Sequence, residues 1–111
     1  MSPAIARAVL IIDMQEGMAD RIRAGRPTAT PDAPDRIAVL LADARSRGLP
    51  VIHVLHDDPN PASPFRKGAS GAEPMACATP LQGETVFWKH GSSAFHGTGL
   101  DAHLKDRGIT E

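Results

Sequence analysis

Two charged residues stand at the ends of apolar segments, where a buried strand would leave the core. Asp13 follows the apolar run at 9–12 (VLII), and Lys89 closes the segment 84–89 (ETVFWK). In α/β proteins the carboxyl ends of parallel strands are where ligands bind. At such a place a carboxylate can accept a proton, and an ammonium group beside it can stabilise a negative charge. We therefore predict that Asp13 and Lys89 meet at one sheet edge, the alternatives being a turn aspartate and a solvent-facing lysine.

The histidines and the cysteine are weaker candidates. His53 and His56 lie three residues apart in a predicted strand, so their side chains point to opposite faces and cannot easily share one ion. His56, Asp57 and Asp58 form an alternative set of metal ligands, weighed against a solvated polar loop. Cys77 is the single cysteine of the chain. It lies in a loop rich in Ala and Pro, with no His or Lys close in sequence, which predicts an inert thiol.

Composition limits the class of protein. A chain of 111 residues with a net charge of −1 has the length of one domain and shows no basic patch for nucleic acid. No apolar run approaches the roughly 20 residues of a membrane span. The N-terminus lacks the features of a signal peptide and a lone cysteine cannot form an internal disulfide, so we expect a cytoplasmic protein. The content of Ile, Leu, Val and Phe is low, which predicts a thin core and favours a homo-oligomer.

Three apolar segments predict a parallel sheet. Strands are expected at 8–13, 51–55 and 84–89, separated by the long crossovers that parallel strands require. The fold class is therefore α/β, a parallel sheet flanked by helices. The order of elements predicts one more buried strand after Gly108. We accordingly expect residues 1–111 to form a single domain that is incomplete at its C-terminal side.

Two segments have the pattern of helices. Residues 34–47 carry apolar side chains at helical spacing, and Asp32 precedes them as a candidate N-cap. A shorter helix follows Thr98, which could cap it in a capping box with Asp101.

Two other segments are predicted as loops. Residues 14–34 contain Gly17, Gly25 and Pro27, which allow at most one turn of helix. Residues 57–83 are dense in Pro, Gly, Ala and Ser. A loop of this length is usually functional or disordered, so this one is a candidate lid or substrate loop.

Taken together, these motifs resemble one family. The resemblance is carried by the segments LIIDMQ (10–15), VIHVLHD (51–57), SPF (63–65) and GETVFWKHGSSAFHGTGLDAHLKDRGIT (83–110). They are similar to the isochorismatase-like hydrolases, also called the cysteine hydrolase superfamily, which include nicotinamidases. The most specific part is Lys89 followed by Ser93, Ala94 and Phe95. The resemblance implies a parallel sheet between helical layers and an active site made of an Asp, a Lys and a Cys.

The resemblance assigns the catalytic Asp to Asp13 and the catalytic Lys to Lys89. The family's Cys follows the strand after the Gly-Ile-Thr turn, so the expected nucleophile lies beyond this sequence. Cys77 precedes Lys89 and is not that residue. The implied reaction is hydrolysis of a small amide, in which Asp13 takes the proton of the thiol and Lys89 stabilises the thiolate. In the isochorismatase branch it is hydrolysis of a vinyl ether, for which an acid and a cation suffice.

The remaining expectations concern binding. The predicted partner is a small-molecule substrate, with Gln15 and Phe95 lining its pocket. No cofactor is expected. No metal is predicted either, because His56-Asp57-Asp58 departs from the Asp-x-His order found in some nicotinamidases. A competing hypothesis is a non-catalytic, truncated or degenerate copy of the fold that is stabilised by oligomer contacts.

Overall fold

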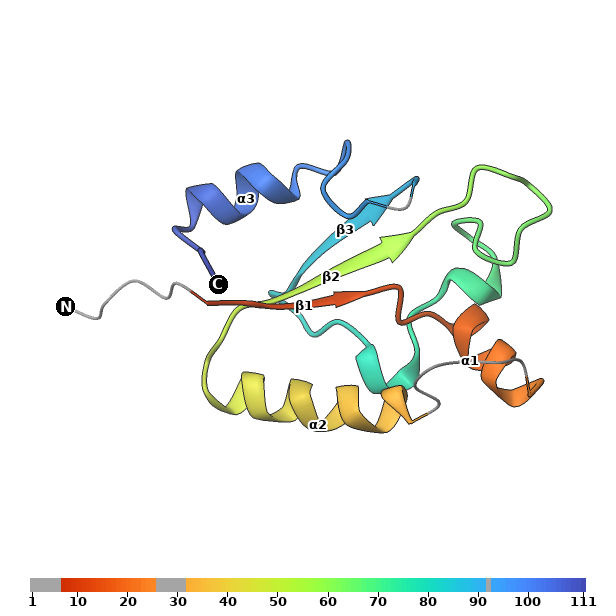
Figure 1. Cartoon of the computed structure of the whole chain (residues 1–111), viewed down its shortest axis with the longest axis horizontal. Helices are drawn as coiled ribbons and strands as arrows, with labels where there is room; N and C mark the ends of the chain where they lie inside the picture. Colours follow the sequence, from red (N-terminus) through yellow and green to blue (C-terminus); the bar gives the residue numbers. More distant parts are fainter. Residues whose placement is uncertain (1–6, 26–31, 92) are drawn as a thin grey trace.

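A three-stranded parallel sheet forms the centre of the computed structural model, which describes residues 7–25, 32–91 and 93–111. The strands are β1 (Val9–Ile12), β2 (Val51–His56) and β3 (Thr85–Lys89), in the order β1-β2-β3. Helix α2 (Ala33–Ser46) covers one face of the sheet and α3 (Leu100–Asp106) the other (Figure 1). The predicted α/β class with three layers is therefore confirmed.

Strand β2 supplies both layers of the core because its side chains alternate between the two faces. Val51 packs with Leu41 and Ala44 of α2, whereas Ile52 packs with Leu100 of α3. Since β2 has a hydrogen-bonded strand on each side and a helix over each face, its residues 51–55 are all buried. This central strand fixes the carboxyl edge at which the two outer strands also end.

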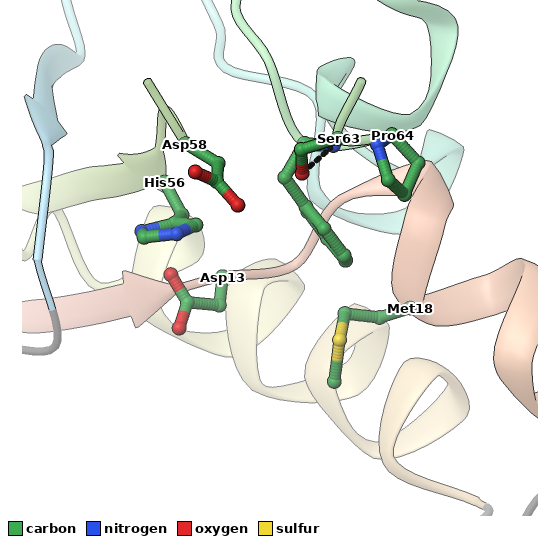
Figure 2. A pocket seen from close by; sticks show the side chains of 7 residues that line it. Asp13, Met18, His56, Asp58, Ser63 and Pro64 are labelled. Atoms are coloured by element: carbon green, nitrogen blue, oxygen red, sulfur yellow. Dashed lines mark hydrogen bonds between the residues drawn. The ribbon is translucent and has the colours of Figure 1, made fainter. Parts of the chain in front are cut away.

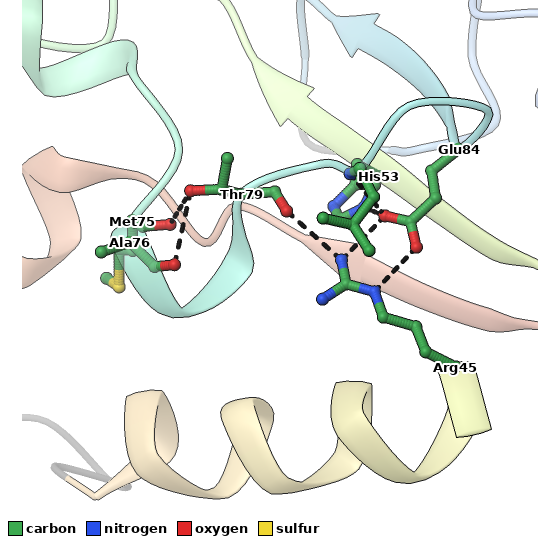
Figure 3. A network of polar contacts seen from close by, with 7 residues as sticks. Arg45, His53, Met75, Ala76, Thr79 and Glu84 are labelled. Carbon is green, nitrogen blue, oxygen red and sulfur yellow. Dashed lines mark hydrogen bonds and ion pairs between the residues drawn. The ribbon is translucent and has the colours of Figure 1, made fainter.

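A polar network ties α2 to the sheet (Figure 3). The Arg45 guanidinium donates two hydrogen bonds of 2.8 Å to the carboxylate of Glu84, and His53 Nε2 lies 2.8 Å from the same carboxylate. The Arg45 side chain also donates to the carbonyl oxygen of Thr79. These hydrogen bonds hold the Glu84 pKa well below its usual range, at about 2, with the Arg45 hydrogen bonds as the largest cause.

The prediction that residues 14–34 hold at most one helical turn is wrong. This segment contains α1 (Glu16–Arg23), eight residues long, at the carboxyl end of the sheet (Figure 1). Gly17 lies inside α1, with the ring of Phe65 packed close to its Cα. A Cβ on Gly17 would lie 2.7 Å from Cζ of Phe65. Tertiary packing thus outweighs the low helix propensity of glycine. Pro27 lies outside the described residues.

The predicted helix caps also differ in detail. Asp32 occupies the N-cap position of α2, but its carboxylate accepts a hydrogen bond from the Arg36 side chain rather than from the helix backbone. The cap position of α3 is taken by Gly99, whose φ of +81° suits glycine. Thr98 Oγ1 accepts the Leu100 N–H at 3.2 Å, and Asp101 forms an ion pair with Lys105. The capping box is therefore wrong.

The long loop between β2 and β3 is attached to the start of α1. It contains two short 3₁₀ turns, Ser70–Ala72 and Ala76–Ala78. Its main chain accepts a hydrogen bond from the Glu16 N–H at Glu73 and donates one from Met75 to Met14. These bonds bring the loop beside the carboxyl edge of the sheet, the place that a substrate loop would need. Its role as a lid stays a prediction.

Candidate active site

Asp13 and Lys89 meet at the carboxyl edge of the sheet, as predicted. Asp13 directly follows β1 and Lys89 ends β3, with β2 between them. Lys89 Nζ lies 3.4 Å from Asp13 Oδ2 and donates a hydrogen bond of 3.0 Å to the carbonyl oxygen of Gly91. The Lys89 side chain is 4% exposed and that of Asp13 is 40% exposed. The ammonium group is therefore held in the protein, while the carboxylate can be reached from outside.

The backbone of Asp13 adopts a strained conformation. Its φ of +62° makes it the one non-glycine residue with positive φ in the described part of the chain. This conformation costs an ordinary L-residue roughly 1–2 kcal/mol, and such strain gathers at functional sites. Hydrogen bonds hold the residue there, from the Asp13 N–H to the Val54 carbonyl and from the Gln15 N–H to the Asp13 carbonyl. The neighbouring main chain thus holds Asp13 in this conformation at the end of β1.

A cavity of about 400 Å³ opens beside this carboxylate (Figure 2). It is lined by Asp13, Met18, His56, Asp58, Ser63, Pro64 and Phe65. Met18 comes from α1 and Phe65 from the long loop, so the cavity depends on elements that lie far apart in sequence. Of its polar groups, Asp13 and His56 come from the ends of β1 and β2, whereas Asp58 and Ser63 come from the long loop. Apolar walls with a few polar groups are typical of sites for small molecules.

The carboxylate of Asp58 stays ionised at the rim of this cavity. Its pKa is lowered, chiefly by the backbone N–H of Asn60 and then by the Ser63 hydroxyl and the charge of His56. Asp58 and Asp13 therefore present two carboxylates to the same space, with His56 between them (Figure 2). From the sequence alone, His56 and Asp58 are candidates only as metal ligands.

Gln15 and Phe95 are not among the side chains that line this cavity. Gln15 is 0% exposed and its amide group is fully hydrogen-bonded. Its Oε1 accepts the His56 N–H at 2.9 Å, while Nε2 donates to the carbonyl oxygens of His56 and Ala72. Phe95 is 54% exposed. Gln15 thus fixes the end of β2 against the long loop, and contact of either residue with a substrate stays a prediction.

Cys77 is not part of the Asp13 cavity. It lines a separate cavity with Met75 and Ala76. Burial, the largest cause, raises the pKa of its thiol, which disfavours the thiolate and agrees with the expectation of an inert thiol. His53 and His56 do face different surroundings, the Glu84 network and the cavity. Over residues 7–25, 32–91 and 93–111 no three His, Cys, Asp or Glu side chains are placed to hold a metal.

Sequence reasoning missed the apolar wall of the site. Met18 lies in a segment that is predicted as a loop. Phe65, the one aromatic residue in the segment 57–83, enters only as part of the SPF motif, with no place in the predicted site. A large apolar side chain in a loop of small residues is a signal that it packs against something. The lining by Ser63 and Pro64 follows from the same loop, whose path no local pattern specifies.

Comparison with known proteins decides the family. The model of the isochorismatase domain matches residues 7–111. The chain belongs to the isochorismatase family. It is 36% identical over 107 residues to the uncharacterized isochorismatase family protein YddQ of Bacillus subtilis (strain 168), covering 94% of this chain and 58% of the relative. It is 33% identical over 106 residues to the secreted isochorismatase effector Isc1 of Verticillium dahliae, covering 90% of this chain and 52% of the relative.

The solved structures agree with this assignment. An isochorismatase-family protein from Chromobacterium violaceum has a TM-score of 0.87 and 40% identity, and the match covers all of this chain and 56% of the other. The isochorismatase-family chain thus spans a little over half the length of these relatives. No helix among its described residues is long and apolar enough to cross a membrane. Because one relative is named as secreted, the cytoplasmic location stays a prediction.

Proposed function

We propose that this isochorismatase-family chain contributes the Asp and Lys of a hydrolase acting on a small amide. The observation that carries the proposal is the ion pair of 3.4 Å between Asp13 and Lys89, beside a cavity that Asp13 lines. The positive φ of Asp13 and the burial of Lys89 support a catalytic role, because the fold maintains both at a cost.

In this mechanism Asp13 accepts the proton of an incoming thiol, and Lys89 stabilises the thiolate. The thiolate adds to the amide carbonyl, the amine leaves, and water hydrolyses the thioester. Cys77 lines a different cavity, so it does not supply this thiol. The nucleophile comes instead from residues outside these 111, as the family pattern implies, or from a small thiol added to the solution.

Vinyl ether hydrolysis is the second candidate function. The specific observation in its favour is that a carboxyl group and a cation already lie 3.4 Å apart, without a thiol beside them. A protonated Asp13 would donate its proton to the vinyl carbon. Water would then add to the neighbouring carbon, and the resulting hemiketal would break down to a carbonyl compound and an alcohol. Protonation leaves a positively charged oxocarbenium ion, which the carboxylate of Asp13 stabilises once it has given up its proton.

The test is turnover of a panel of small amides and vinyl ethers, with and without a small thiol such as 2-mercaptoethanol. Asp13→Asn and Lys89→Met should each lower kcat/KM about 10²-fold or more, in the range of general acid–base effects. Asp101→Asn is the matched control, because Asp101 forms an exposed ion pair of 3.0 Å with Lys105 on α3.

The outcomes separate the hypotheses. Amide turnover that needs added thiol supports the first function, whereas vinyl ether turnover without thiol supports the second. Turnover that survives both Asp13→Asn and Lys89→Met contradicts the catalytic assignment. A chain that folds and turns over nothing in the panel supports the non-catalytic alternative.

Two further expectations belong to this proposal. We propose that Phe95, which is 54% exposed, contacts the substrate, so that Phe95→Ala raises KM and leaves kcat near its original value. We also propose a homo-oligomer, because Ile12 and Val86 expose apolar surface on the two edge strands. Sedimentation of the 111-residue chain measures the second point directly.

A further inference from the structure

The imidazole of His56 lines the cavity beside Asp13, and the proposed function gives it no role. It lies between the carboxylates of Asp13 and Asp58 (Figure 2). His56 Nδ1 is buried and has no hydrogen-bond partner among the residues that the structure describes. Buried polar atoms are nearly always paired, so an unpaired one calls for an explanation. The same holds for Asp13 Oδ1, which is likewise buried and unpaired in the described part of the chain.

The position of His56 is fixed by more contacts than a surface histidine would need. The side-chain amide of Gln15 forms hydrogen bonds with the main-chain N–H and with the main-chain carbonyl oxygen of His56. The ring packs edge-on against Phe65, with 6.2 Å between ring centroids. His56 is also the register partner of Lys89 in the sheet. The imidazole is therefore held in one place at the wall of the cavity, as a group that acts on a bound ligand should be.

The charges around this ring come from three elements. Asp13 follows β1, Asp58 lies in the loop after β2, and Lys89 ends β3. Lys89 forms its ion pair with Asp13, and the side chain that α1 contributes to the cavity is the uncharged Met18. An imidazole can both give and take a proton near neutral pH, which an ammonium group and a carboxylate do less readily. His56 is thus equipped for proton transfer in a site whose base is Asp13.

We propose that His56 is the general acid that protonates the leaving nitrogen of the substrate. The proposal rests on the amide hydrolase function proposed above. The thiol gives its proton to Asp13, and its sulfur forms a bond to the carbonyl carbon. When the tetrahedral intermediate collapses, the C–N bond breaks and its electron pair stays on nitrogen, which takes a proton from His56. Because Nδ1 is buried, we assign this proton to Nε2. The proton held by Asp13 returns to His56 through solvent.

A pair of substrates with the same acyl group tests this role in the whole chain with added 2-mercaptoethanol. One is an N-alkyl amide, whose amine must be protonated to leave, and the other is the 4-nitrophenyl ester, whose phenolate leaves without a proton. His56→Gln should lower kcat/KM for the amide about 10²-fold or more and that for the ester less than about tenfold. Both rates come from one sample, so their ratio does not depend on the folded fraction. His56→Asn provides a second variant.

His90→Gln is the matched control. His90 lies near the same sheet edge, 3.3 Å from Asp57, but its side chain is 63% exposed and does not line the cavity. The His90→Gln variant should therefore hydrolyse both the amide and the ester at the wild-type rates. Equal losses on amide and ester in His56→Gln, or no loss on either, would overturn the general-acid role while the proposed function stands. A wild-type chain that turns over neither substrate would refute the amide hydrolase function and this role with it.

Discussion

Replacing Glu84 by Gln tests whether the network between α2 and the sheet stabilises the fold. The Glu84 carboxylate accepts hydrogen bonds from Arg45, from the Leu81 N–H and from His53, whose side chain is 1% exposed. A Gln at this position keeps the shape but loses the charge, and its amide nitrogen cannot accept from Arg45. The buried His53 and the guanidinium would then be left with weaker partners.

The expected loss follows from the pKa of Glu84. A fall in pKa from 4.5 to about 2 corresponds to an upper limit of roughly 3.5 kcal/mol, at about 1.4 kcal/mol per pKa unit. Because the Arg45 side chain is 27% exposed and water weakens the ion pair, we expect about 2 kcal/mol for Glu84→Gln. For a domain of this size that amounts to a fall in Tm of roughly 8 °C.

The pH dependence has a defined sign. Because the folded-state pKa of Glu84 is below its ordinary value, the stabilisation is complete above about pH 4.5 and is lost as the pH falls towards 2. Urea unfolding of wild type and Glu84→Gln should therefore differ most at pH 7 and least near pH 2. Asp43→Asn is the control, since its ion pair with Arg47 is exposed on both sides. If the free energies of unfolding of wild type and Glu84→Gln differ by less than about 0.5 kcal/mol at pH 7, the usual size of surface effects, the reasoning is refuted.

Three further predictions concern the site. Gln15→Leu should lower the free energy of unfolding by roughly 2–4 kcal/mol in urea, because it leaves main-chain groups of β2 and the long loop unpaired. Gly71→Ala should lower the free energy of unfolding by about 1–3 kcal/mol, because the added Cβ would lie 2.3 Å from a backbone oxygen. Gly91→Ala is the control and should change this free energy little, because the space around Gly91 is open. Asp13→Asn should destabilise the fold more than Lys89→Met, because it leaves a buried ammonium group without that carboxylate; the reverse order would contradict the burial argument.

The pairing of Asp13 with Lys89 could be predicted because it depends on a rule of sheets. Both residues end apolar strands, and parallel strands end at the same edge. The cavity beside them could not be predicted, because Met18 and Phe65 reach it from α1 and from the long loop. The helix α1 was missed for a related reason. The effect of Gly17 depends on its contact with Phe65, which local propensity does not contain.

The role of Gln15 also could not be predicted from the local sequence. Gln15 is predicted to line the pocket, yet the fold buries it and uses its amide to join β2 to the loop. A polar side chain next to a site can face the ligand or the core, and the neighbouring elements decide which. Arg45 and Glu84 likewise lie 39 positions apart, so no local pattern joins them.

By itself the sequence determined the α/β class, the three strands and the edge at which Asp13 and Lys89 meet. Those features follow from the apolar segments that mark buried strands and from the long crossovers between them, which parallel strands require; both can be read along the chain. The tertiary structure alone decided the strained backbone of Asp13, the walls of the cavity and the place of His56 between two carboxylates. Each of these depends on contacts between segments distant in sequence, whose geometry is set only when the core packs.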